Sequence, residues 1–334
     1  MANRNNVVAI FTEQYKIELE KAPMPVLKDG YVCVEYLYCG ICGGDYSVYR
    51  GYRHSYPISL GHEFVGKVIS VSPSVKNLIE GQYVVSDFNY RCNECCYCLE
   101  GKSHLCVSND IGHFSNRGFA KYASIHSSYL VAIQPPEYLP RACLIEPLSC
   151  VIHACHEVSI NSKLQMLICG SGGIGMLFCF ILLRVYNNIN VTVAETNLLK
   201  LDLLCKHFAV QKYLPTNQKK YDLIIDCSNS INGLQFALDK AKRGSNICIM
   251  SHLYGLETSF VYEQACKKEL HCSFPLRNGE QSNLLVAADL IKKHWTQEDD
   301  EMLTIYDNVD IAFKEKASSP YCKQIVCLSK LLVP

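Results

Sequence analysis

Residues 164–183 read LQMLICGSGGIGMLFCFILL, a run of twenty residues without a charge. Its length and apolarity alone would fit a membrane span. Glycines at positions 170, 172, 173 and 175 interrupt the run, however, and separate a short apolar strand from an apolar helix. The stretch therefore predicts a buried strand, glycine turn and helix inside an α/β domain.

The glycines have the spacing Gly170-x-Gly172-x-x-Gly175, which indicates dinucleotide binding when it lies between a strand and a helix. Gly170 permits the tight turn, Gly172 lets the backbone approach a pyrophosphate, and Gly175 allows the helix to pack closely on the strand. The helix N-terminus, at Gly173 and Ile174, then faces the phosphates with its partial positive charge. We expect all five residues to belong to the cofactor site.

Glu195 stands twenty residues after Gly175, at the end of the next expected strand, 190–195. A carboxylate at this place accepts hydrogen bonds from a ribose 2′-hydroxyl and repels a 2′-phosphate, which favours NAD over NADP. The nearest following cation is Lys200, and no arginine follows closely. The alternative is a glycine-rich turn in an α/β domain that binds no nucleotide.

The segments around residues 164–183 differ in pattern. Before it, short β-type runs separated by Gly, Pro and Asp predict a barrel-like or sandwich-like part, with strands at 31–38, 64–71, 82–86 and 120–124. After it, strand candidates alternate with helix candidates, which predicts a parallel sheet covered on both faces. These candidates are the strands 222–226 and 245–250 and the helices 198–208 and 231–241. Beyond about residue 274 only a helix at 283–294 and a β-like run at 323–328 are indicated.

The chain has 334 residues, with 32 basic and 32 acidic side chains and no net formal charge. This balance removes the electrostatic case for nucleic acid or an anionic membrane surface as the main partner. The length predicts about two domains. Residues 1–16 lack a basic region followed by an apolar one, so we expect no secretory signal, a cytoplasmic location and no disulfides.

Twenty cysteines are the one abnormal figure in the composition, and five of them fall in RCNECCYCLEGKSHLC, residues 91–106. Four have the spacing Cys-x2-Cys-x2-Cys-x7-Cys: Cys92, Cys95, Cys98 and Cys106. Four thiolates from one tight loop form the closed tetrahedral shell of a structural zinc site. An iron–sulfur cluster is the alternative, because thiolates at short spacing also hold iron. Cys96 is the one left over.

A second group of metal-ligating residues lies upstream, where Cys42 and His62 supply a thiolate and an imidazole and Glu63 directly follows the histidine. Glu146 is a further candidate, since a carboxylate inside an apolar stretch is costly to bury unless it binds something. A catalytic zinc takes three protein ligands and leaves a fourth position open. A buried histidine with one hydrogen bond and a core cysteine are the alternative.

Six motifs occur in the order that is found in the zinc-dependent medium-chain dehydrogenase/reductase superfamily. They are CGICGGD (39–45), GHEFVG (61–66), the four cysteines, GFAKYA (118–123), LIEPLSCVIHAC (144–155) and the glycine turn. The chain resembles the sorbitol (polyol) and threonine dehydrogenase branch over nearly its whole length. The resemblance implies an α/β fold, in which a GroES-like β-rich catalytic domain (1–150 and 275–334) is interrupted by a doubly wound Rossmann NAD-binding domain (151–274). The active site would lie in the cleft between the two domains.

The resemblance also implies roles for single residues. His62 and Cys42 correspond to ligands of the catalytic zinc, and Glu146 to the glutamate ligand of the polyol branch. Glu63 corresponds to an acid that ligates zinc or lies just behind it. We expect Asp45 to orient the Cys42 loop rather than to take a proton. With the four-cysteine site, the chain would hold two zinc ions.

The implied activity is hydride transfer from a secondary alcohol to NAD, with a polyol, sugar or cyclitol as the small-molecule substrate. DYSVYRGYRHSYPISLGHE, residues 45–63, also resembles aminocyclitol dehydrogenases. Arg277 lies where it could meet nicotinamide or substrate, or simply the surface. The alternatives are a threonine-type amino-alcohol dehydrogenase and a catalytically silent member that binds zinc and nucleotide. By analogy with the family, we expect a homodimer or homotetramer.

Two residues depart from the family pattern. Gly44 stands where the family has Ser or Thr, and Ser47 stands where a histidine is common. In the family the Ser or Thr hydroxyl passes the alcohol proton toward solvent. The resemblance therefore does not say which group carries the proton in this chain. The candidates are Ser47, Tyr46, Tyr49 and a zinc-bound water held by Glu63 or Glu146, with barrel packing expected for at least one tyrosine.

Overall fold

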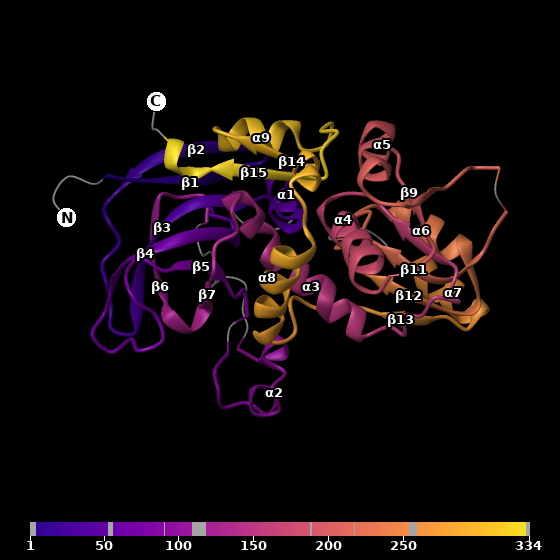
Figure 1. The fold of residues 1–334 in the computed structure, drawn as a ribbon, viewed down its shortest axis with the longest axis horizontal. Helices are drawn as coiled ribbons and strands as arrows, with labels where there is room; N and C mark the ends of the chain where they lie inside the picture. The colour runs from indigo at the N-terminus through magenta and orange to yellow at the C-terminus, as the bar shows by residue number, and fades with distance from the viewer. Residues whose placement is uncertain are drawn as a thin grey trace.

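The computed structural model describes residues 5–52, 56–89, 91–108, 118–187, 189–216, 218–253 and 259–331. All candidate ligand and cofactor residues lie within these ranges, whereas residues 53–55 of the aminocyclitol-like stretch lie outside them. Two β-sheets lie side by side, one built mainly from the first part of the chain and the other from its middle (Figure 1).

The first sheet combines strands from the two ends of the chain, in the order β14-β15-β3-β4-β5-β7, with β6 paired to β3. Its strands are β3 (Tyr31–Gly40), β4 (Glu63–Val71), β5 (Tyr83–Ser86), β6 (Tyr122–His126), β7 (Leu130–Ile133), β14 (Leu303–Tyr306) and β15 (Lys323–Cys327). A hairpin of β1 (Asn6–Glu13) and β2 (Lys16–Ala22) lies beside it. Because β15 is antiparallel to β3, and β3 aligns Gly40 with Glu63 of β4, the late strand begins next to the candidate zinc ligands.

The second sheet is parallel and has the order β10-β9-β8-β11-β12-β13. Its strands are β8 (Met166–Cys169), β9 (Val191–Ala194), β10 (Gln211–Lys212), β11 (Tyr221–Asp226), β12 (Ala241–Ile249) and β13 (His271–Ser273). The helices between them are α4 (Gly173–Phe180), α5 (Leu198–His207), α6 (Ile231–Lys240) and α7 (Ser259–Lys268). The predicted alternation of strands and helices is therefore confirmed.

The stretch 164–183 forms β8, the glycine turn and α4, which continues as one π-helical segment at Ile181–Val185. All six side chains from Met176 to Ile181 are buried. Among the described residues, no helix is both long and apolar enough to cross a membrane.

One apolar core connects the two sheets. It contains Val65 and Val85 from the first sheet, Ile168 from the second, and half of the residues of α3 (Ile145–His156). On its other side α3 packs against α8 (Ser282–His294). Because this core is continuous, it fixes the walls of the space between the sheets relative to each other.

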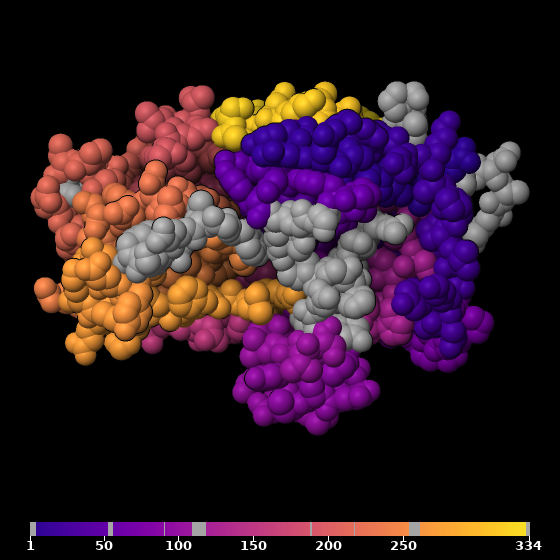
Figure 2. All heavy atoms as spheres, turned by 180° about the vertical axis from the view of Figure 1, so that it is seen from behind, coloured from indigo at the N-terminus to yellow at the C-terminus, as the bar shows by residue number. Residues whose placement is uncertain are grey.

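The remaining elements are short: α1 (Gly43–Tyr49), α2 (Cys96–Leu99), α9 (Val309–Glu315), and single turns at 103–105, 127–129, 139–144, 298–302 and 328–330. Residues 91–106, called the cysteine lobe below, project away from both sheets (Figures 1 and 2). All twenty cysteines carry free thiols. Several cysteines outside the lobe are buried in the core, among them Cys143, Cys155, Cys169, Cys179 and Cys248, while Cys150 and Cys227 are half-buried.

Candidate active site and metal centres

The cysteine lobe brings its four predicted ligands together. The sulfur atoms of Cys92, Cys95, Cys98 and Cys106 lie within 4.8 Å of one another. The backbone N–H groups of Cys95 and Glu94 donate to Cys92 Sγ at 3.3 and 3.5 Å. Backbone N–H groups also lower the pKa of Cys92, and they lower that of Cys95 to about 6. Burial, in contrast, raises the pKa of Cys98 to about 12. Four sulfurs this close together, two of them held close to ionisation, fit a divalent metal, since the thiolate is the binding form.

A second group consists of Cys42, His62 and Glu63, whose ligand atoms also lie within 4.8 Å of one another. Cys42 is the N-cap of α1, and its sulfur accepts a hydrogen bond from the Gly44 N–H at 3.3 Å. His62 precedes β4, and Glu63 is the first residue of that strand. Residues far apart in the sequence thus converge where β4 begins and α1 begins.

Asp45 joins two of these ligands. The Cys42 N–H donates to Asp45 Oδ2 at 3.4 Å, while Asp45 Oδ1 lies 3.6 Å from His62 Nδ1. Although burial disfavours the imidazolium, the Asp45 and Cys42 charges raise the pKa of His62 well above its usual value. The contacts support the orienting role expected for Asp45.

Aromatic stacking covers the other face of the imidazole. The ring of Phe88 lies 4.2 Å from that of His62, at an interplanar angle of 22°. Arg277 places its guanidinium over Phe88, 5.5 Å from the ring centre. It therefore lies behind Phe88, and it is not among the described residues that line the large cleft defined below. Contact between Arg277 and nicotinamide stays a prediction.

Glu63 has a partner that the sequence did not indicate. Its carboxylate forms an ion pair with Lys323, the first residue of β15, and the two residues are only 2% and 3% exposed. A Cβ at Gly40 would come within 2.6 Å of Glu63 Oε2 and 2.8 Å of Lys323 Cε, so a larger residue there would displace the ion pair. Breaking a buried pair of this kind leaves an uncompensated charge.

Glu146 is buried in the first turn of α3 and accepts a hydrogen bond from Cys150 Sγ at 3.6 Å. Burial and the negative charge of Glu63 raise the pKa of Glu146 to about 7, against the opposing effect of His62. Glu146 thus interacts electrostatically with the second group but is not in its close cluster. The structure brings Glu63, rather than Glu146, next to Cys42 and His62.

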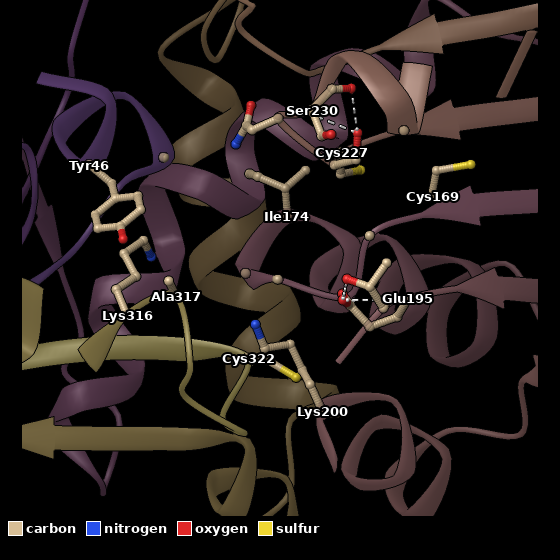
Figure 3. A pocket seen from close by; sticks show the side chains of 18 of the residues that line it. Tyr46, Cys169, Ile174, Glu195, Lys200, Cys227, Ser230, Lys316, Ala317 and Cys322 are labelled. Carbon is tan, nitrogen blue, oxygen red and sulfur yellow. Dashed lines mark hydrogen bonds between the residues drawn. The ribbon is translucent and has the colours of Figure 1, made fainter. Parts of the chain in front are cut away.

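A cleft of about 760 Å³ lies between the two sheets (Figure 3). One wall includes Cys42, Gly43, Tyr46 and Glu63. The opposite wall includes four of the predicted cofactor residues, Gly170, Gly172, Gly173 and Ile174. Gly170 has a φ of 98°, and a Cβ at Gly175 would lie 2.0 Å from Gly170 O. The turn and the close helix packing expected for these glycines are therefore present.

Glu195 and Lys200 also line the cleft. Glu195 Oε2 accepts from the backbone N–H and the hydroxyl of Ser171, at 2.8 and 2.9 Å, and Oε1 accepts from the N–H of Asn197 at 2.9 Å. Although burial opposes ionisation, these N–H groups lower the pKa of Glu195. A carboxylate that stays charged would repel a 2′-phosphate.

The candidates for proton transfer lie in two different environments, the apolar core and the cleft. Tyr49 is 2% exposed and packs edge-on against Phe11, so it is a core residue. Tyr46 and Ser47 line the cleft, although the Ser47 hydroxyl already donates to Gly43 O at 3.0 Å. A Cβ at Gly44 would meet Cys42 Sγ at 3.7 Å, an ordinary contact. The position has room for the side chain that the family carries.

Two residues of the site were missed by the sequence analysis, namely Lys316 and Lys323. Both line the cleft; Lys316 directly follows α9, and Lys323 is the first residue of β15. Lys323 offered a signal in retrospect, because it is the charged first residue of a β-like run that is otherwise mostly apolar. Lys316 offered none.

The comparisons with known proteins agree with this architecture. Residues 28–135 match the alcohol dehydrogenase GroES-like domain. D-arabinitol dehydrogenase 1 of Uromyces fabae is 24% identical over 74% of this chain and 72% of its own length. D-arabitol-phosphate dehydrogenase of Enterococcus avium is 32% identical over 53% of this chain and 51% of its own. A structure described as a short chain alcohol dehydrogenase of Escherichia coli CFT073, complexed with NADH, has a TM-score of 0.84, 23% identity, and coverage of 97% of this chain and 100% of that one.

The fold and the two cysteine-containing clusters fit an oxidoreductase of the alcohol dehydrogenase type, with two places where metal-ligating residues converge. Residues 28–135 belong to the alcohol dehydrogenase GroES-like domain family. The chain as a whole, with a GroES-like part and a Rossmann-type part, shares its fold with the solved alcohol dehydrogenase structure.

Proposed function

We propose that this chain oxidises a secondary alcohol of the polyol, sugar or cyclitol class and passes the hydride to NAD. The observation that carries the proposal is the shared cleft. Cys42 and Glu63 line one wall of it, and the glycine turn with Glu195 lines the other. The names of the two relatives, an arabinitol and an arabitol-phosphate dehydrogenase, support a polyol or its phosphate ester as the substrate.

The donor set of the second group fits a catalytic zinc. A thiolate, an imidazole and a carboxylate within 4.8 Å of one another are the ligands that zinc takes in open sites. Bound there, zinc supplies Lewis acidity that lowers the pKa of a substrate hydroxyl. We propose Cys42 and His62 as ligands with one carboxylate, either Glu63 or Glu146. The cysteine lobe would hold a second, structural zinc.

The neighbouring residues preorganise this site. Asp45 contacts the Cys42 backbone and the His62 ring and so fixes both. Lys323 compensates the charge of Glu63, which is buried and could not stay ionised alone without a large cost. Phe88 covers the His62 ring and keeps water from that face.

We propose NAD as the cofactor and the domain boundaries expected from the sequence, 1–150 with 275–334 and 151–274. Strand membership supports the boundaries, because β8 to β13 form one sheet and the strands before and after form the other. The charged Glu195 supports NAD. Replacing Glu195 by alanine should weaken NAD binding more than NADP binding, and an unchanged preference would show that Glu195 has another role.

The activity is tested by incubating the chain with NAD and a panel of polyols, their phosphate esters, aminocyclitols and threonine, while NADH absorbance is followed. We expect NADH with at least one polyol or polyol phosphate, and none with the His62→Ala variant. NADH with threonine alone would point to the amino-alcohol branch. No NADH with any substrate from a zinc-loaded, folded chain would favour the silent member.

A further inference from the structure

Lys316 is a cation of the cleft that the proposed reaction does not yet use. It follows α9 and lies on the wall that carries Cys42 and Tyr46 (Figure 3). Its ammonium donates to Ile41 O at 3.2 Å and to Gln324 Oε1 at 3.0 Å. Both acceptors are neutral. An ammonium has three N–H donors, so one is left for a ligand.

The charges around Lys316 do not neutralise it. Lys323 and Lys200 lie near it on the same cleft, and burial together with these two cations lowers the pKa of Lys316 to about 8. Of the carboxylates that line the cleft, Glu63 is paired with Lys323 and Glu195 is held by backbone N–H groups. Among the described residues, none gives Lys316 a carboxylate within ion-pair distance.

Gly43 lies close to a residue of the opposite wall. A Cβ on Gly43 would lie 2.7 Å from the Asn229 amide nitrogen, which reaches over from the end of β11. Asn229 is fixed in turn, since its Oδ1 accepts from the His252 N–H at 3.0 Å and its own N–H donates to Ser251 Oγ at 2.8 Å. The Asn229 amide N–H groups therefore reach from one wall to the other at Gly43, and Lys316, which donates to Ile41 O, adds a positive charge to that second wall.

We propose that Lys316 is a phosphate-binding residue of this cleft, with its remaining N–H donated to a phosphate oxygen of the bound ligand. The inference rests on the proposed function. Two ligands could supply that oxygen: the diphosphate of the dinucleotide or a phosphate ester on the polyol. Lys200, on α5, also extends into the cleft (Figure 3), so two elements from different parts of the chain offer cations to a ligand bound there.

The cofactor source is tested with ADP-ribose and adenosine, whose binding to the zinc-loaded chain is measured by calorimetry. If the diphosphate is the partner, Lys316→Met should weaken ADP-ribose by about tenfold, the usual loss for one charge-assisted hydrogen bond. Adenosine affinity should stay unchanged, and Lys316→Arg should recover most of the loss. Lys314→Met is the matched control, because Lys314 lies on the same segment but pairs with Asp310 and is 60% exposed.

The substrate source is tested by the KM of a polyol and of its phosphate ester. If the ester is the partner, Lys316→Met should raise the KM of the ester by about tenfold and leave the free polyol and ADP-ribose unchanged. A loss of either kind supports the proposal and identifies the ligand. The proposal is overturned if neither changes, or if adenosine and ADP-ribose weaken equally with a lower melting temperature, as a structural role would require. The binding measurements need no turnover, so they stand even if no alcohol is oxidised.

Discussion

The two clusters of metal-ligating residues differ in how the chain builds them. The cysteine lobe draws all four sulfurs from fifteen consecutive residues and projects away from both sheets. The second cluster draws its ligands from α1 and β4, and its glutamate is paired with a lysine 260 positions away. A structural site can thus be local, whereas the open site depends on the tertiary fold.

The comparison predicts that the clusters fail independently. Replacing His62 by alanine should lower kcat/KM by at least about 1,000-fold, because the group that stabilises the developing alkoxide loses its anchor. The fold should survive, since the lobe and the core are untouched. Steady-state kinetics beside a thermal melt checks this, and a variant with more than a tenth of normal activity would contradict the assignment of His62.

Lys323→Met should lower the stability of the fold around the second cluster while leaving the cysteine lobe unaffected. Because Glu63 would remain as an unpaired buried charge, we expect a loss of about 3–5 kcal/mol in the free energy of unfolding. Urea denaturation measures it. The double variant Glu63→Gln with Lys323→Met should recover part of the loss, because the orphaned charge is gone.

The same variant should leave the cysteine lobe able to bind its metal, since no lobe residue contacts the ion pair. If Lys323→Met cost less than about 1 kcal/mol, or if the double variant were no more stable than the single one, the pair would not be the link between β15 and the open site.

Gly44→Ser should have the smallest effect of these variants, and it should raise activity where the others lower activity or stability. The new side chain fits, since a Cβ there meets Cys42 Sγ at 3.7 Å. It restores the hydroxyl through which the family passes its proton, so we expect kcat to rise by up to about 100-fold with little change in the melting temperature. Stopped-flow or steady-state rates measure it. An unchanged or lower kcat in a folded variant would mean that this chain moves the proton by another route.

The sequence predicted what depends on local spacing. The glycine turn, Glu195, the four lobe cysteines and the alternation of strands and helices in the middle of the chain all follow from residues close together in sequence. Each of these patterns has a physical reason that acts within a few residues, such as the φ of 98° at Gly170. The structure confirms the turn and the alternation and brings the four sulfurs together, whereas the roles of Glu195 and of the cysteines stay predictions.

Contacts between distant segments were not predictable in the same way. Nothing in the pattern around Glu63 reveals Lys323, because the two meet only when β15 pairs with β3. For the same reason, the sequence does not reveal that Lys316 donates to Ile41 O or that Asn229 lies close to Gly43. Arg277 could have been placed at nicotinamide or at the surface by its sequence position, yet the structure stacks it on Phe88.

The central claim is that this chain holds two independent zinc sites, of which only the open one supports oxidation. Zinc content per folded chain, measured by mass spectrometry for the wild type, His62→Ala and Cys98→Ser, tests it most directly. We predict about two zinc ions in the wild type and about one in each variant, with activity abolished in His62→Ala. One zinc in the wild type, lost in Cys98→Ser and unaffected by His62→Ala, would contradict the claim.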